Sequence, residues 1–165
     1  MNVKHSNIII VAMLLFAVLS IMLIVFLNQA HEDFKNDITV SASGVTEKTL
    51  TVRDLKLTPT QQTEFDVGLT CAASGSYNIS LDYIEQRDGG MKHFIDVVVK
   101  YNGEVVYEGN LLELLDGDEI VRFEGVLEEK EPCTITIVYE MPIDVGNEAQ
   151  GTSADFDIRL RIEKS

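Results

Sequence analysis

The side chains that most often carry out catalysis are few in this sequence. Its three histidines are His5, His31 and His93. None of them stands in a His-x-x-x-His or His-Glu-x-x-His pattern, which would place two imidazoles on one side of a helix to bind zinc. No serine stands in the Gly-x-Ser-x-Gly pattern of a nucleophile elbow. The sequence therefore predicts no catalytic residue, no metal-ligand set and no cofactor, and we expect His93 to be an exposed loop residue.

Carboxylates gather at residues 116–119, which read Asp-Gly-Asp-Glu. Hard cations such as Ca²⁺ prefer oxygen ligands of this kind. The segment lacks the Asp-x-Asp-x-Asp-Gly spacing and the distant Glu of an EF-hand loop. We interpret it as a solvated turn, with cation binding as the alternative.

Cys71 and Cys133 are the only cysteines of the chain. Neither belongs to a Cys-x-x-Cys pair or stands beside a histidine, which argues against zinc binding and redox catalysis. Each is in phase with the apolar residues of a period-two pattern, so both are expected on inward strand faces, where facing sheets approach each other. A disulfide between them would close a loop of roughly 60 residues and contribute about 4 kcal/mol. Two buried free thiols are the alternative.

Residues 8–27 form an unbroken apolar segment in which only Ser20 is polar. As a helix it would span about 30 Å, the thickness of a bilayer core. Lys4 precedes this segment and Glu32 and Asp33 follow it, so the positive-inside rule places the N-terminus in the cytoplasm and the remainder outside. We therefore predict that residues 1–30 are a transmembrane anchor or a signal segment, through which the chain contacts the membrane if it is not cleaved.

The best candidate cleavage site of this segment follows Ala30. It fits the small-x-small rule poorly, because Asn28 stands where a small residue is expected. The apolar segment is also longer than a secretory signal needs. A retained anchor is therefore favoured over a cleaved signal, and a buried core helix is the least favoured interpretation.

The charge balance excludes one class of function. Lys4 is the only Lys or Arg among residues 1–30, so the rest of the chain has 12 Lys+Arg against 27 Asp+Glu, a net charge of −15. Such a surface repels phosphate backbones, so we expect no nucleic-acid partner. We predict a short acidic linker at residues 31–36 and one extracellular domain at residues 37–165.

Apolar residues of this domain recur with period two, which indicates strands. The clearest runs are residues 65–71, 77–83, 133–141 and 154–162. A bulge is expected near Arg53 and Asp54, where the apolar phase changes.

Turn signals delimit the other elements. Asn102-Gly103 stands between two β-rich runs and predicts a hairpin. Asn110 is expected to cap a short helix that ends at Gly117. About nine strands and one short helix indicate an all-β fold, an antiparallel β-sandwich of the jelly-roll kind.

The closing stretch resembles the C-terminal signature of the camelysin and TasA family of exported proteins of Gram-positive bacteria. In that family a strand ends in a Met-Pro or Leu-Pro step, followed by a Gly-Asn turn, a Gln-Gly loop and a last strand with Phe near its start. The matching residues are Met141, Pro142, Gly146, Asn147, Gln150, Gly151 and Phe156. Residues 55–69 are similar to the family's first core strands, with Thr60 where Gly is usual, and residues 109–118 to its short helix.

This resemblance implies a jelly-roll domain in a matrix fibre subunit or an accessory protein. In the fibre-forming members an N-terminal strand completes the sheet of the next subunit. The corresponding association strand here contains Ile38, Val40 and Ala42. Camelysin has been described as a metal-dependent protease, but the sequence offers no ligand set for that activity.

Three hypotheses for function follow. The first is a non-enzymatic surface or matrix protein that associates with itself or with other envelope proteins. The second is a permanently anchored accessory or ligand-binding module of an envelope complex. The third and least favoured is a surface metalloprotease. All three place the domain on the outer face of the cytoplasmic membrane or secreted to the cell surface.

Overall fold

Strands make up most of this computed structural model, which describes residues 37–165 apart from 43 and 118. The nine strands within these residues are β1 Ile38–Val40, β2 Val45–Leu55, β3 Gln62–Cys71, β4 Gly75–Gly89, β5 Asp96–Tyr101, β6 Glu104–Asn110, β7 Val121–Leu127, β8 Cys133–Glu140 and β9 Ser153–Lys164. One short helix, α2 (Leu111–Leu115), and two 3₁₀ turns, η1 (Met91–Phe94) and η2 (Asn147–Ala149), interrupt them. The prediction of an all-β fold with one short helix is confirmed.

The described residues belong to one compact unit, Phe34–Ser165. The predicted anchor at residues 1–30 and linker at residues 31–36 lie outside the part of the chain that the structure describes, so both stay predictions. No helix within the described part is long and apolar enough to cross a bilayer.

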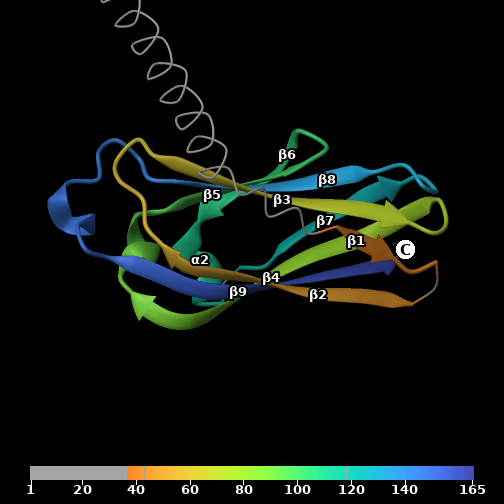
Figure 1. Ribbon diagram of the computed structural model, residues 1–165, viewed down its shortest axis with the longest axis horizontal. Helices are drawn as coiled ribbons and strands as arrows, with labels where there is room; N and C mark the ends of the chain where they lie inside the picture. Colours follow the sequence, from red (N-terminus) through yellow and green to blue (C-terminus); the bar gives the residue numbers. More distant parts are fainter. Residues whose placement is uncertain (1–36, 43, 118) are drawn as a thin grey trace, which may run out of the picture. The chain divides into compact units, whose positions relative to one another are not determined.

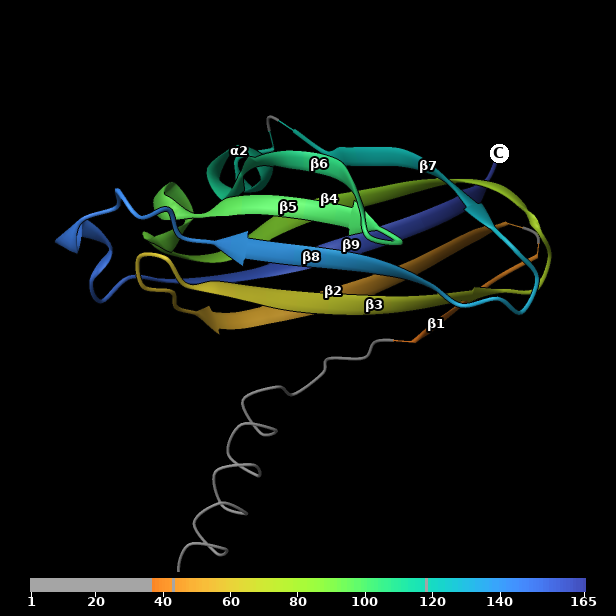
Figure 2. The ribbon, with the colours of Figure 1, turned by 90° about the horizontal axis from the view of Figure 1, so that it is seen from above.

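The strands form two sheets that lie as two layers (Figure 1; Figure 2). The five-stranded sheet has the order β1-β3-β8-β5-β6, and the four-stranded sheet has the order β2-β9-β4-β7. All neighbours are antiparallel except β1 and β3, which run parallel. The expectation of an antiparallel sandwich therefore needs one correction, at the N-terminal strand.

Aromatic side chains join the two layers at the centre of the core. Tyr139 on β8 meets Phe156 on β9 edge to face, with 5.6 Å between the ring centroids. Tyr83 on β4 lies 5.8 Å from the same Phe156 ring, and the Tyr139 hydroxyl lies 3.5 Å from the Tyr83 hydroxyl. Burial raises the pKa of both tyrosines, so both stay neutral inside the core.

The turns follow the sequence signals closely. Asn102 and Gly103 both have positive φ, 50° and 86°, in the two-residue turn between β5 and β6, which confirms the predicted hairpin. The Asn110 side chain accepts a hydrogen bond of 2.8 Å from the Leu112 N–H at the start of α2, which confirms the predicted cap. The β2 register shifts between Val52 and Leu55, where a bulge was expected.

Thr60 is the unusual residue of these turns. Its φ of 70° lies in the left-handed region, which a β-branched residue adopts only with strain. The connection between β2 and β3 holds it there, because its N–H donates to the Met141 carbonyl at 2.9 Å and the Met141 N–H donates to the Gln61 carbonyl at 3.1 Å. A glycine would adopt this conformation without strain.

We predict that Thr60→Gly stabilises the domain by about 0.5–1 kcal/mol, because relief of the left-handed strain exceeds the entropy cost of an added glycine. Urea unfolding followed by circular dichroism measures the effect. The matched control is Thr49→Gly in strand β2, where the same change should destabilise the domain by about 0.5–1 kcal/mol. A loss of stability in Thr60→Gly as large as in the control would contradict the prediction.

Candidate functional site

The predicted association strand lies on an edge of its own domain. β1 pairs only with β3, in the register Ile38↔Leu69, Thr39↔Thr70 and Val40↔Cys71 (Figure 2). Ile38 and Val40 are 7% and 1% exposed and belong to the core, whereas Thr39 points to solvent. Two of the three predicted association residues therefore fill core positions of the same molecule.

The third predicted residue, Ala42, is a correction. It lies after the end of β1 and is exposed, so it takes no part in the strand. The strand ends early because the chain leaves for the other sheet within residues 41–44. There the Ser41 N–H donates to the Thr46 hydroxyl at 3.0 Å, and Gly44 has a φ of 94°. A three-residue strand at a sheet edge holds few backbone hydrogen bonds, so we expect β1 to open at a lower cost in free energy than the longer strands.

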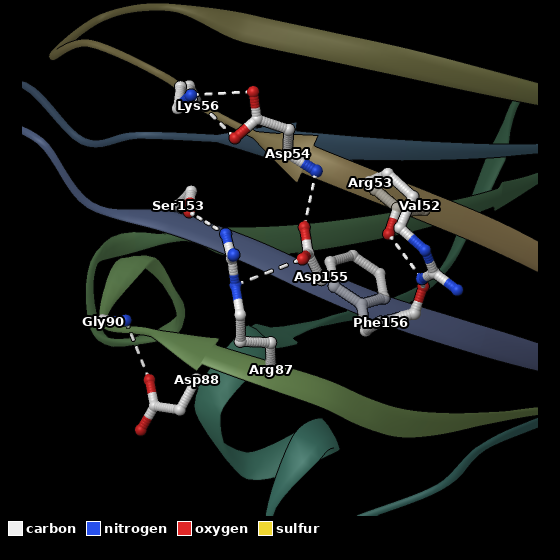
Figure 3. A network of polar contacts seen from close by, with 10 residues as sticks. All are labelled: Val52, Arg53, Asp54, Lys56, Arg87, Asp88, Gly90, Ser153, Asp155 and Phe156. Carbon is white, nitrogen blue, oxygen red and sulfur yellow. Dashed lines mark hydrogen bonds and ion pairs between the residues drawn. The ribbon is translucent and has the colours of Figure 1, made fainter.

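A second polar feature lies where β9 runs between two bulged neighbours (Figure 3). β2 shifts register between Val52 and Leu55, and β4 shifts between Glu85 and Arg87, both next to Asp155. The Asp155 carboxylate, 17% exposed, accepts from the Asp54 N–H at 2.7 Å and lies 3.3 Å from the Arg87 Nε. One carboxylate thus accepts from a backbone N–H at the β2 bulge and pairs with an arginine side chain beside the β4 bulge. This arrangement is structural.

The buried cation of the domain is Lys92 in η1, whose side chain is 9% exposed. Its ammonium lies 3.0 Å from Glu85, 3.1 Å from Asp116 and 3.7 Å from Asp88. These partners come from β4 and from the C-terminal end of α2, so Lys92 ties three elements together. Burial alone lowers the pKa of Lys92, but its hydrogen bonds to Glu85 and Asp116 outweigh burial and raise that pKa.

The ion pairs of Lys92 also include a carboxylate of the acidic segment at residues 116–119. The Asp116 carboxylate faces the lysine ammonium, and Glu119 accepts from the Tyr107 hydroxyl at 3.0 Å. Asp118 lies outside the described residues. Within the described residues no three His, Cys, Asp or Glu side chains gather closely enough to hold a metal ion. Within the described residues, the cation that contacts this acidic turn is therefore the Lys92 side chain.

Sequence analysis missed Lys92, because a single lysine in Gly-Gly-Met-Lys-His-Phe carries no pattern that marks it as buried. Its partners Glu85 and Asp116 stand 7 and 24 residues away. The neighbouring His93 is exposed as expected, with its ring 6.4 Å from that of Phe94.

Both cysteines are buried free thiols, the second of the two alternatives, and the expected disulfide is absent from the described residues. Both lie on inward strand faces as expected, 3% and 8% exposed, but on β3 and β8, which are neighbours in one sheet and do not face each other across the core. Cys133 pairs with Leu69, which places Cys71 diagonally across from it. Cys71 donates to the Glu128 carbonyl at 3.2 Å. Burial raises the pKa of Cys133, which keeps it a thiol at neutral pH and makes it a poor nucleophile.

Comparison with known proteins assigns no family to the chain. No family model and no curated protein matches it. Among solved structures it is similar to a beta-glucosidase from Paenibacillus barengoltzii, with 12% identity and a TM-score of 0.35, over 78% of this chain but 11% of that chain. It is also similar to Aeromonas hydrophila PliG, a periplasmic inhibitor of g-type lysozyme, with 12% identity and a TM-score of 0.34 over 78% of this chain and 99% of that chain. Likenesses this weak carry no argument about function.

We predict that Lys92→Met destabilises the domain by about 1–2 kcal/mol at pH 8, because three carboxylates that are 29–54% exposed then face one another without their cation. Urea unfolding measures the change. Lys130→Met is the matched control, since that side chain is 85% exposed and pairs only with Glu129, and it should cost less than about 0.5 kcal/mol.

A comparison of wild type with Lys92→Met at different pH values tests the role of the Lys92 charge. Because the folded-state pKa of Lys92 is raised, its contribution is fully present below the pKa of an unfolded lysine, about 10.4, and is lost as pH rises through the folded value. The difference in stability between wild type and Lys92→Met should therefore shrink above about pH 10.5. The buried Tyr83 and Tyr139 lower the stability of both proteins in that range, so they cancel in the difference. A difference that is constant from pH 8 to beyond pH 11 would refute this role for the Lys92 charge.

Proposed function

We propose that this protein is a non-enzymatic surface or matrix protein that assembles by β-strand addition. The observation that carries the proposal is the place of β1, a three-residue parallel strand on the edge of the five-stranded sheet whose Ile38 and Val40 fill core positions. An identical strand from a second copy would restore the same contacts. Exchange of β1 between copies therefore creates a link without any new complementary surface.

The energetics favour β1 as the exchanged element. Fully burying an Ile or Val side chain contributes about 1.5–3 kcal/mol, so opening this strand costs much less than unfolding the two sheets. An opened molecule has an unpaired β3 edge with empty sites beside Leu69 and Cys71. Such an edge readily pairs with another strand.

Two features of the fold support the resemblance to the camelysin and TasA family. Without β1, the strand orders β3-β8-β5-β6 and β2-β9-β4-β7 alternate along the chain as in a jelly roll. Thr60 stands where the family has Gly, and its positive φ explains why Gly is usual there.

The second candidate is the permanently anchored accessory or ligand-binding module. The apolar segment at residues 8–27 and the poor cleavage site after Ala30 favour it. A surface metalloprotease has the least support, since no group of metal-ligating side chains stands out among the described residues. All three hypotheses share an exported domain.

The intact mass of the native protein, measured separately in membrane and extracellular fractions, separates the first two candidates. We expect an assembling subunit to have lost roughly the first 30 residues and to lie outside the membrane. A full-length mass of 18.4 kDa found only in the membrane fraction would instead establish the anchored module and remove free fibre assembly.

We predict that Val40→Asp abolishes assembly, because a carboxylate cannot occupy the apolar core site that the incoming strand must fill. Deletion of residues 37–43 should have the same effect. Thr39→Asp is the matched control, since it adds the same charge one residue away on the solvent side of β1 and should leave assembly intact. Electron microscopy and sedimentation measure assembly, and circular dichroism checks that each variant folds. Unchanged assembly in folded Val40→Asp would eliminate strand addition through β1.

A further inference from the structure

Strand β1 follows only part of the edge of the five-stranded sheet. β3 spans ten residues, Gln62–Cys71, and β1 pairs with its last three, Leu69–Cys71. A strand edge of this kind readily accepts an added strand, because its backbone N–H and C=O groups point outward in the plane of the sheet. A longer strand in the β1 position would therefore continue beside residues 62–68.

A cleft opens on this side of the sandwich, where β2 and β3 lie along the facing edges of the two layers (Figure 2). Its lining is mostly apolar and comes from both sheets: Leu50 and Val52 from β2, Phe65 and Val67 from β3, Ile137 from β8 and Ile158 from β9. Phe65 is half-buried and packs edge to face on Tyr139, with 5.5 Å between the ring centroids. The cleft is thus an apolar site next to the part of β3 that β1 does not follow.

The chain just before β1 already keeps to β3. Ile38 lies opposite Leu69, and the preceding Asp37 lies so close to Gly68 that a Cβ at Gly68 would collide with the Asp37 carboxylate. Glycine at this position therefore allows the close approach of the two backbones. Because β1 and β3 run parallel, continuing this register backward leads along β3 toward Gln62.

The sequence fits that continuation. The three residues that come before read Phe-Lys-Asn. The β1 register extended over them places Phe34 opposite Phe65 and Lys35 opposite Asp66. Phe34 is in phase with the buried Ile38, so it belongs on the core side, next to the cleft. Lys35 belongs on the solvent side, where opposite charges on neighbouring strands attract each other.

We propose that residues 34–36, which lie outside the described part of the chain, dock on the edge of β3 in the same molecule, with the Phe34 ring over the cleft. The segment adjoins β1 directly, so no loop has to be closed and its effective concentration at this edge exceeds that of any other chain. The docked strand spans residues 34–40 and closes the side of the sandwich between β2 and β3. In an exchange between copies, which rests on the strand addition proposed above, Phe34 joins Ile38 and Val40 as a third apolar anchor.

Paired cysteines test the docking and its register in the full chain in detergent. Lys35→Cys/Asp66→Cys places two thiols opposite each other on the solvent side, so mild oxidation should join them. Lys35→Cys/Glu64→Cys is the matched control, because Glu64 lies two residues further along β3, about 7 Å away. Its disulfide should form at least about tenfold more slowly, since the backbone must move to bring the thiols together. Mass spectrometry locates each disulfide, and wild type oxidised in the same way accounts for Cys71 and Cys133.

Substitutions of Phe34 within the Lys35→Cys/Asp66→Cys protein test the ring itself. Phe34→Asp should slow formation of the disulfide about tenfold or more, because a carboxylate is not stable against the apolar lining of the cleft. Phe34→Leu is the matched control, since it keeps an apolar side chain and should allow the disulfide to form nearly as fast as with Phe34. Equal rates in Phe34→Asp and Phe34→Leu would overturn the role of the ring.

Electrophoresis without reductant separates this inference from strand addition. A disulfide within one chain, in a protein that does not assemble, would support the docking and contradict strand addition. A ladder of chains joined through positions 35 and 66 would support both, because an exchanged strand makes the same contacts. Equal rates for the two cysteine pairs, in a protein whose assembly still requires Val40, would keep strand addition and overturn the docking of residues 34–36.

Discussion

The rest of the structure depends on the contact between Tyr139 and Phe156, which joins the two sheets across the core at a ring distance of 5.6 Å. Phe156 fixes β9, and β9 is the strand on which β2 and β4 both pair. Both neighbours bulge beside it, and the next residue outward, Asp155, accepts the hydrogen bond and the ion pair that the bulges present (Figure 3). Two adjacent residues of β9 therefore have different roles. Phe156 packs in the core, and Asp155 binds polar groups of both neighbouring strands on the outer side of the sheet.

The local features were predictable from sequence because local geometry determines them. A strand turns alternate side chains to opposite faces, so the period-two runs identified inward residues such as Tyr77, Ile135 and Phe156. The Asn102-Gly103 turn and the Asn110 cap depend on two or three neighbouring residues and were also found. By contrast, the period-two pattern shows which side chains share one face of a strand, but it does not show which sheet the strand joins. It therefore could not place Cys71 and Cys133 on neighbouring strands.

The features that sequence analysis missed all depend on long-range pairing. Lys92 is a buried cation only because β4 and α2 bring carboxylates to it from both sides. A strand containing Ile38 and Val40 was predicted, but its parallel pairing with β3 of the same molecule was not, since alternation fits either partner equally well. This ambiguity has a physical cause, because a β1 strand from another copy would make the same contacts with β3 as the molecule's own β1.

The proposed strand addition would extend the five-stranded sheet within its own plane, through backbone hydrogen bonds and apolar side chains that salt hardly weakens. Residues 31–165 have a net charge of −15, so two copies repel each other as they approach. Salt screens this repulsion over about 10 Å at 0.1 M, while the contacts of β1 with β3 do not depend on charge. Once one strand is exchanged, the linked copy is present at high effective concentration, so the apolar contacts of Ile38 and Val40 are set against a repulsion that weakens with added salt.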